Sequence, residues 1–237
     1  MSDDIKWERG DSGFDMTLLK YSIRRLVPLG QGPNVLDAGC NDGLFTKELY
    51  KNYEHVIGID SSPAHVVKAR QNVPDAEFHV VQIEDYIPSE LLDSIYMLNV
   101  LEHVINPIGI LKRMRDWLKP GGCIIIQVPN ALSMNRRIGQ RMQLISNVYS
   151  LSPSDTEVGH SRFYDSVSLR QDVIDSGLVV ELSGSIFLKP LANPQMRYFV
   201  DHCLETDDLR AKFCDACFDM AAELPDYSSP IWVKCTK

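Results

Sequence analysis

Apolar and polar positions follow one another along the chain in blocks that predict a strand, then a helix, then another strand. The helical segments show apolar residues at a spacing of three and four positions. Short apolar runs typical of buried strands occupy 34–39, 54–60, 76–84, 92–100 and 123–130. Regular alternation of this kind predicts an α/β protein with a doubly wound, mostly parallel sheet and helices on both faces.

Local start and stop signals place the helices between these runs. An amphipathic helix is expected at 14–27, before the first strand, and another at 43–51. Ser62 and Pro63 begin a helix that extends to about residue 71, with serine as its cap and proline in the first turn. The helix that carries Leu111, Met114 and Leu118 is expected to stop at Lys119-Pro120-Gly121-Gly122, ahead of a strand that begins at 123.

The C-terminal part continues the alternation after a long interruption at 131–164. Asp165 is the expected cap of a helix at 166–176, and Gly177 its stop. A strand at 178–187, a mostly helical stretch at 189–228 and a last, antiparallel strand at 231–235 follow. At 237 residues we expect one domain, with 1–30 as a helical cap and 131–164 and 189–228 as insertions on the substrate side.

Composition narrows the class of protein. The net charge is −8, which argues against a nucleic-acid partner because such partners need a basic surface. No apolar run approaches the length of a membrane span, and the start of the chain lacks the apolar segment of a signal peptide. We therefore expect no integral membrane segment and a cytoplasmic location with reduced thiols.

The cysteines allow two interpretations. Cys214 and Cys217 form a CxxC pair that could bind structural zinc together with Cys203 and Cys235. The same pair also fits the apolar face of a helix, because the apolar residues of 211–222 recur at helical spacing. We expect the second interpretation.

The stretch NVLDAGCNDGLFTKEL, at 34–49, predicts a ligand cradle. Asp37 lies near the end of the first strand, and Gly39 and Gly43 enclose a polar turn that leads into a helix. Glycines let backbone N–H groups approach a ligand where a Cβ would clash. Asp60 ends the second strand, 23 positions after Asp37, where a carboxylate can accept both hydroxyls of a ribose. The third glycine of a dinucleotide fingerprint is missing, and the leading aspartate would attract an amine rather than a pyrophosphate.

With these features the chain resembles the class I S-adenosylmethionine-dependent methyltransferases, which have a Rossmann-like fold. Four segments carry the resemblance, in the family's order, across roughly 30–190: VLDAGCNDG, VIGIDSS, NVLEHV at 99–104 and LKPGGCIIIQVPN at 118–130. The resemblance implies S-adenosylmethionine as cofactor, with its methionine part at Asp37 and Gly39 and its ribose at Asp60. Gln82 and Ile83 would flank the adenine, although the family often has aspartate in place of Gln82. The cofactor-binding residues expected on this basis are Asp37, Gly39, Cys40, Asp42, Gly43, Asp60, Ser61, Gln82, Ile83, Asn99 and Val100.

Two histidines flank the expected pocket and are the candidate catalytic residues. His103 follows the fourth strand, and His160 lies in GHSRFYD, just before the helix at 166. A neutral imidazole can take the proton of a hydroxyl nucleophile near pH 7. Some relatives bind a divalent cation through Glu-x-x-Glu-His and a distal histidine, so Glu102, His103 and His160 form an alternative metal site. Asn99 replaces the first glutamate of that pattern, and we therefore expect no metal.

The acceptor is the least readable part. Residues 131–150 form a basic, amphipathic segment with Arg136, Arg137 and Arg141, which we expect to be a lid, with its arginines solvated or facing an anionic substrate. Its position also resembles the lipid-contacting insertion of quinone-pathway methyltransferases. GHSRFYD and FLKPLANPQM, at 187–196, resemble a subgroup associated with sugars or other small metabolites.

We predict methyl transfer to an oxygen or nitrogen of a small-molecule acceptor, such as a sugar or a nucleotide-linked sugar, and leave a homodimer open. The alternatives are a quinone-type O-methyltransferase at a membrane surface, an NAD(P)-dependent oxidoreductase and a binding protein that has lost the chemistry. The absent third glycine argues against the oxidoreductase. The presence of Asp37, Gly39, Gly43 and Asp60 argues against the binding protein.

Overall fold

The computed structural model describes residues 13–237, which contain a seven-stranded sheet of order β3-β2-β1-β4-β5-β7-β6. Its strands are β1 (Asn34–Ala38), β2 (His55–Asp60), β3 (Glu77–Val80), β4 (Leu92–Leu98), β5 (Leu118–Val128), β6 (Val179–Ser185) and β7 (Ile231–Thr236). β3, β2, β1, β4 and β5 pair in parallel, whereas β7 pairs antiparallel with both β5 and β6. The predicted fold class, including the antiparallel last strand, is confirmed.

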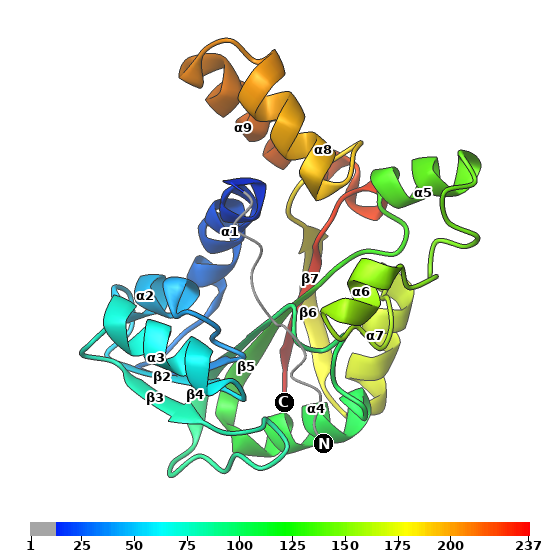
Figure 1. Cartoon of the computed structure of the whole chain (residues 1–237). Coiled ribbons are helices and arrows are strands. Elements are labelled where there is room, and N and C mark those ends of the chain that lie inside the picture. The colour runs from blue at the N-terminus through cyan, green and yellow to red at the C-terminus, as the bar shows by residue number, and fades with distance from the viewer. Residues whose placement is uncertain (1–12) are drawn as a thin grey trace.

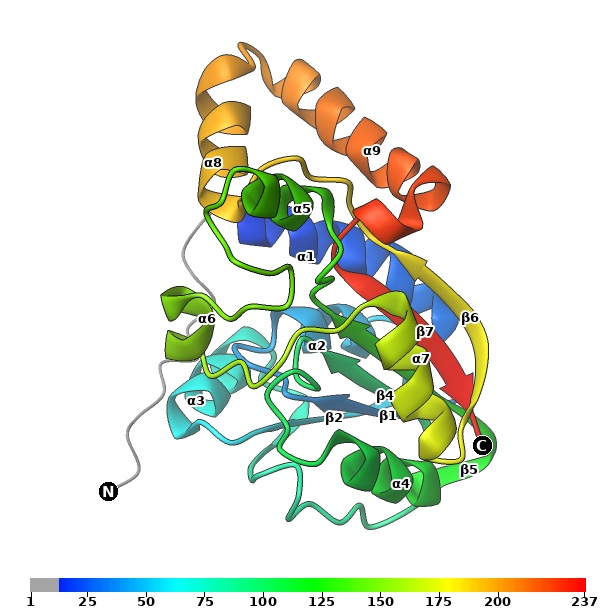
Figure 2. The ribbon, with the colours of Figure 1, turned by 90° about the vertical axis from the view of Figure 1, so that its right-hand side faces the viewer.

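Helices lie on both faces of this sheet (Figure 1). They are α1 (Gly13–Leu26), α2 (Leu44–Tyr50), α3 (Pro63–Asn72), α4 (Pro107–Trp117), α5 (Met134–Arg141), α6 (Pro153–Glu157), α7 (Ser166–Asp175), α8 (Asn193–Tyr198) and α9 (Asp207–Glu223). A π-helical turn, Phe199–Cys203, continues α8, and short 3-10 turns occupy Val27–Leu29 and Pro225–Tyr227. Figure 2 shows α8 and α9 beyond α1, away from the sheet.

Each face of the sheet has its own apolar core. On one face, Tyr21 of α1 packs against Phe187 and Phe218, with ring centroids 5.5 and 5.0 Å apart. On the other face α4 and α7 bury residues such as Leu111 and Val173 against β4 and β5. The cysteines of the CxxC pair belong to the first core as buried residues of α9. Their burial among apolar side chains of α9 agrees with the second interpretation of the CxxC pair.

Several local signals are confirmed. Ser62 caps α3 by accepting a hydrogen bond from the His65 backbone N–H, and Pro63 stands in the first turn. Asp165 caps α7 in a reciprocal capping box with Ser168. Gly177 follows the end of that helix at φ +80°, a conformation that favours glycine.

Two strand boundaries differ from the prediction. α4 ends at Trp117, but the Lys119-Pro120-Gly121-Gly122 segment belongs to β5, which begins at Leu118 rather than at 123. The Lys119 ammonium lies 2.7 Å from Asp93, which ties this irregular segment to the neighbouring strand β4. β3 is shorter than predicted and stops at Val80, because the chain turns at Gln82, whose carbonyl accepts from the N–H groups of Asp85 and Tyr86.

The parallel strands all end at the same edge of the sheet, and this edge is where the polar residues of the predicted site gather. α1 lies against it with Asp15, Leu18, Leu19 and Ser22, which recur at helical spacing on one face. The part of the predicted cap before residue 13 lies outside the described residues. Across residues 13–237, no helix has the length and apolar character needed to span a membrane.

Candidate active site

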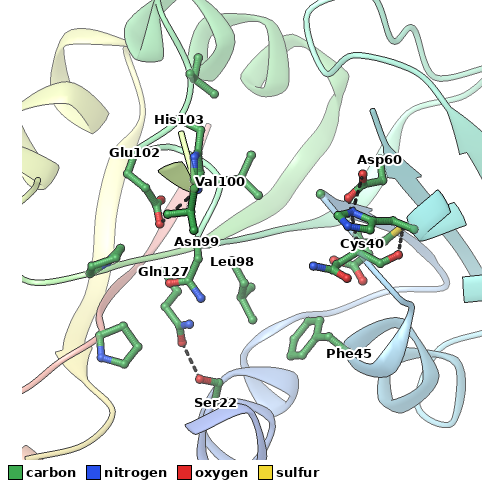
Figure 3. A pocket seen from close by; sticks show the side chains of 18 of the residues that line it. Ser22, Cys40, Phe45, Asp60, Leu98, Asn99, Val100, Glu102, His103 and Gln127 are labelled. Carbon is green, nitrogen blue, oxygen red and sulfur yellow. Dashed lines mark hydrogen bonds and ion pairs between the residues drawn. The ribbon is translucent and has the colours of Figure 1, made fainter. Parts of the chain in front are cut away.

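A cavity of about 550 Å³ opens at the carboxyl edge of the sheet. Its walls come from the ends of β1, β2, β4 and β5, from α1, and from loops that follow β3, β6 and α6. In Figure 3, Asp60 and Cys40 lie at one end of the cavity, and Glu102 and His103 lie towards the other. Such a concave site at the carboxyl ends of parallel strands is where open α/β sheets bind ligands.

The glycine turn after β1 has the geometry of a cradle. The N–H groups of Gly39 and Cys40 both donate to the Ile59 carbonyl, at 2.8 and 2.9 Å, which fixes the turn against β2. Gly39 has φ +82°, and a Cβ built there would come within 2.3 Å of Val100 Cγ2. Only glycine fits at this point, because the turn packs directly against Val100, and both residues line the cavity.

Asp60 is held firmly at the end of β2. Its Oδ2 accepts from the Asn41 N–H at 2.9 Å, and its Oδ1 accepts from the Ser62 N–H at 2.9 Å and lies 3.2 Å from His65 Nδ1. The side chain is 12% exposed and lines the cavity. Ser62 caps α3 and donates its backbone N–H to Asp60, so the carboxylate is held at the start of this helix. Its remaining lone pairs can accept hydrogen bonds from a ligand.

Most of the other predicted cofactor residues also reach the cavity, but two do not. Asp37 is buried, accepts from the Thr46 hydroxyl at 2.6 Å and lines the cavity wall. Asp42 and Gly43 do not line it in the described structure, and their assignment to the cofactor stays a prediction. The Asp42 carboxylate accepts from the Leu44 N–H, and Gly43 packs against Ala69 of α3, so these residues shape the turn from behind.

Four of the predicted cofactor residues lie in the turns that follow β3 and β4, not within the strands themselves. Gln82 and Ile83 line the cavity from the turn after β3, and Asn99, at φ +54°, and Val100 do so after β4. Ser61 lines it next to Asp60.

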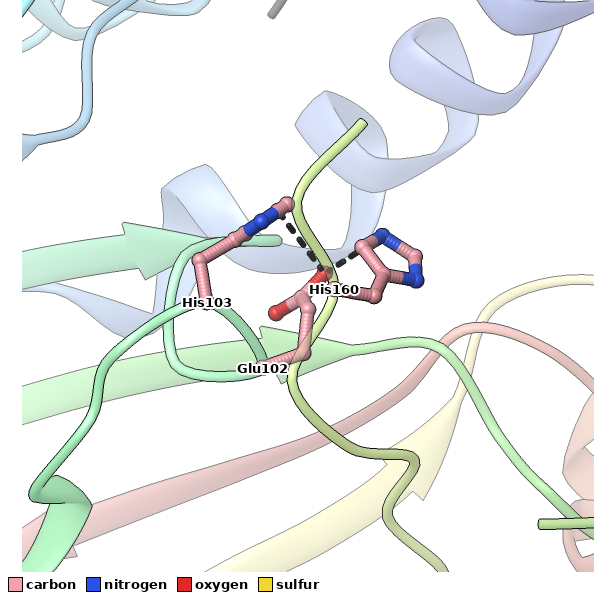
Figure 4. A group of neighbouring side chains, drawn as sticks. All are labelled: Glu102, His103 and His160. Carbon is pink, nitrogen blue, oxygen red and sulfur yellow. Dashed lines mark ion pairs between the residues drawn. The ribbon is translucent and has the colours of Figure 1, made fainter. Parts of the chain in front are cut away.

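The structure brings Glu102, His103 and His160 together, as Figure 4 shows. Glu102 Oε1 lies 3.9 Å from His103 Nε2 and 4.0 Å from His160 Nε2, and the two imidazole centroids are 4.8 Å apart. The loop that carries His160 is tied to this point because the Ser161 N–H donates to the Glu102 carbonyl at 2.9 Å. All three residues line the cavity, so a surface position for His160 is excluded.

Burial sets the protonation states in this cluster. Desolvation raises the pKa of Glu102 to about 8, and neither of its carboxylate oxygens has a hydrogen-bond partner in the described part of the chain. Desolvation, followed by the nearby His160, lowers the pKa of His103 to about 4. Desolvation also lowers the pKa of His160. Near pH 7 the cluster therefore holds a protonated carboxyl and two neutral imidazoles.

The raised pKa of the buried Glu102 carboxyl predicts how stability depends on pH. In the folded protein Glu102 keeps its proton up to pH about 8, whereas in the unfolded chain it loses the proton near its ordinary pKa of 4.5. Wild-type stability should therefore fall as the pH rises between these values. We expect Glu102→Gln to raise the free energy of unfolding at pH 8 by on the order of 1 to 3 kcal/mol, with no gain at pH 4.

Urea titrations at the two pH values measure this effect. The matched control is Glu223→Gln, at an exposed position at the end of α9. Equal stability of Glu102→Gln and wild type at pH 8 would contradict the protonation state assigned to Glu102.

Five further residues that line the cavity were not predicted as site residues. They are Asp15 and Ser22 of α1, Gln127 of β5, and Lys189 and Asn193 after β6. Ser22 Oγ donates to Gln127 Oε1 at 2.8 Å, which joins α1 to the sheet. The spacing of the α1 residues was the available signal, but these five residues come from three distant segments.

The arginine-rich segment does not form the expected lid. In the described structure, no residue of 131–150 lines the cavity. Arg136 donates to the carbonyls of Val148 and Ser150, and its guanidinium lies 3.7 Å from the centroid of the Phe163 ring. Arg137 donates to the Leu132 carbonyl. These two side chains are used to hold their own loop together and are not free for a substrate.

Comparison with known proteins agrees with this site. The profile of a methyltransferase domain family matches residues 14–183, which include the glycine turn, Asp60 and both histidines. The chain belongs to this family and is a member of the class I S-adenosylmethionine-dependent methyltransferases.

Curated relatives match over part of their length. The trans-aconitate 2-methyltransferase of Methylobacterium nodulans is 27% identical over 59% of this chain and 57% of its own. The ubiquinone biosynthesis O-methyltransferase of Bradyrhizobium diazoefficiens is 31% identical over 46% of this chain and 44% of its own. The chain thus spans about half the length of these relatives.

Solved structures share the fold. An S-adenosylmethionine-dependent methyltransferase from Mesorhizobium loti superposes with a TM-score of 0.62 at 16% identity, over 95% of this chain and 100% of that one. The N-methyltransferase NodS from Bradyrhizobium japonicum, in complex with S-adenosylhomocysteine, gives a TM-score of 0.56 at 17% identity, over 81% and 88%.

Proposed function

We propose that this protein transfers a methyl group from S-adenosylmethionine to an oxygen or nitrogen atom of a small-molecule acceptor. The observation that carries the proposal is one continuous cavity that joins the glycine turn and Asp60 to a partly buried histidine pair. S-adenosylmethionine, when bound, supplies an activated methyl group on a sulfonium.

The residues around the glycine turn fit this cofactor. Gly39 lets the turn pack tightly against Val100 at the cavity wall, where the methionine part of the cofactor would lie, with the Asp37 carboxylate nearby. Asp60 accepts the ribose hydroxyls, and Ser61, Gln82 and Ile83 border the adenine. The remaining residues on the cofactor side of the cavity are Cys40, Asn99 and Val100.

We assign His103 and His160 to the acceptor. A neutral imidazole takes the proton of the attacking group, and desolvation keeps both imidazoles neutral near pH 7. The Glu102 carboxyl lies within 4.0 Å of both Nε2 atoms and is neutral near pH 7, so it adds no negative charge that would keep the imidazoles protonated. The side chains of α1 and of the loops after β6 and α6 line the cavity and can align the acceptor with the methyl group.

The relatives support a small-molecule acceptor, because their names specify trans-aconitate and ubiquinone biosynthesis. A sugar or nucleotide-linked sugar remains the acceptor proposed from the sequence. A quinone-type acceptor at a membrane surface is the second candidate. The exposed apolar side chains of the 131–151 region favour this second candidate, because they could contact a membrane surface. They are Ile138, Met142, Leu144, Tyr149 and Leu151.

Transfer of label from methyl-labelled S-adenosylmethionine into a metabolite extract tests the proposed activity. We expect a labelled small molecule that forms with the wild-type protein and in proportion to its amount. Repeating the assay with lipid vesicles added distinguishes the membrane-surface candidate, which predicts that label enters the lipid fraction. No labelled product from either preparation would contradict the proposed function.

A further inference from the structure

A chain of three hydrogen-bonded polar side chains lines the cavity. Asn193 Nδ2 donates to Asp15 Oδ1 at 2.7 Å, and Lys189 Nζ donates to Asn193 Oδ1. Asp15 belongs to α1, whereas Lys189 and Asn193 lie in the segment between β6 and α8 and at the start of α8. All three residues line the cavity.

This arrangement fixes the direction of each group. Because the Asn193 amide nitrogen donates to Asp15, its oxygen must face Lys189. The Lys189 ammonium therefore has a defined position, and one of its three N–H groups donates to Asn193. In the described part of the chain, no carboxylate oxygen lies within the 4.0 Å ion-pair distance of Lys189 Nζ, and its other donors remain available.

The charge of Lys189 is uncommon in this setting. Among the described residues that line the cavity, it is the only lysine or arginine, in a chain whose net charge is −8. Burial lowers the pKa of Lys189 to about 8, so the ammonium still predominates at neutral pH. The Asp15 carboxylate, on the far side of Asn193, stabilises this charge without forming an ion pair, and an anion in the cavity would supply a direct partner.

The position of Lys189 favours the acceptor over the cofactor as this anion. The residues assigned to the cofactor follow β1, β2, β3 and β4, whereas Lys189 follows β6, at the opposite edge of the sheet. Ser22 and Gln127, which also line the cavity, are neutral and can bind polar parts of a substrate.

We propose that Lys189, oriented by Asn193, binds an anionic group of the methyl acceptor, a carboxylate or a phosphate. The inference rests on the proposed function, since it concerns the acceptor of that same cavity. It predicts that neutral and cationic molecules are poor substrates.

Fractionation of the metabolite extract tests the chemical class. The extract is separated on an anion exchanger into an unretained fraction, an early fraction of carboxylates and a late fraction of phosphates, and each is assayed with labelled cofactor. We expect the wild-type protein to methylate molecules of a retained fraction. Methylation confined to the unretained fraction would overturn the inference while leaving the proposed function intact. Absence of methylation in every fraction would overturn both.

Substitution tests the residue itself. With the active fraction, Lys189→Met should raise the acceptor KM about ten- to a hundredfold, the worth of one charge-assisted hydrogen bond, and Lys189→Arg should restore part of it. The affinity of both variants for S-adenosylhomocysteine should stay within about twofold of wild type, which also shows that they fold. Lys212→Met, at an exposed site on α9, is the matched control.

Two results would overturn this assignment. An unchanged acceptor KM in a folded Lys189→Met would show that the ammonium does not contact the acceptor. A loss of affinity for S-adenosylhomocysteine with an unchanged acceptor KM would show that Lys189 binds the cofactor's own carboxylate.

Discussion

Replacing Asp60 with alanine is expected to weaken the binding of S-adenosylhomocysteine by about a hundredfold or more. The carboxylate is fixed by the Asn41 and Ser62 N–H groups and faces the cavity, so a ribose meets an acceptor that is already oriented. Each hydrogen bond to a charged group contributes about 1.5 to 3 kcal/mol, and two ribose hydroxyls can be bound. Titration calorimetry measures the loss directly.

The same substitution removes contacts within the protein, so the control must separate binding from folding. Asp75→Ala deletes one exposed carboxylate between α3 and β3 and should leave the affinity for S-adenosylhomocysteine unchanged. The thermal melting of Asp60→Ala without ligand shows whether it folds. A folded Asp60→Ala that binds S-adenosylhomocysteine as tightly as wild type would remove the ribose role of this residue.

Loss of the imidazole base should lower turnover by about a hundredfold to ten-thousandfold while leaving cofactor binding intact. We expect this for His103→Ala, for His160→Ala, or for both, because both rings line the cavity beside Glu102. The readout is kcat for the labelled methyl transfer, alongside calorimetry with S-adenosylhomocysteine. His55→Gln, at the exposed start of β2, is the matched control.

The pH profile and metal removal distinguish a base from a metal ligand. A neutral imidazole acts as a base above its pKa, and burial lowers the pKa of both histidines. Turnover should therefore persist below pH 6.5 and fall only as the pH approaches the lowered values. Dialysis against a chelator should not change turnover. If activity were lost and then restored by a divalent cation, Glu102, His103 and His160 would be metal ligands instead.

The sequence predicted the fold, and most of the residues that it assigned to the cofactor line one cavity, for a physical reason. Strands buried on both faces are continuous apolar runs, and the polar residues that end them meet at one edge of a parallel sheet. Asp37, Gly39 and Asp60 could be placed because each immediately follows such a run. Asp42 and Gly43 belong to the same turn but face away from the cavity, a difference that spacing alone does not show.

The acceptor side could not be predicted in the same way. Lys189, Asn193 and Asp15 come together through tertiary packing of α8 on α1. Lys189 follows the strand predicted at 178–187, but the sequence pattern does not show that it meets a residue of α1. Arg136 and Arg137 were expected in a lid, but they do not line the cavity. An amphipathic basic pattern does not show that guanidinium groups will donate to backbone carbonyls of their own loop.

Calorimetric titration of the wild-type protein with S-adenosylhomocysteine, and separately with NADH, tests the central claim most directly. If the glycine turn and Asp60 form a cradle for S-adenosylmethionine, the first titration gives saturable binding at one site per chain and the second gives none. Binding of NADH with no binding of S-adenosylhomocysteine would contradict this account of the cavity.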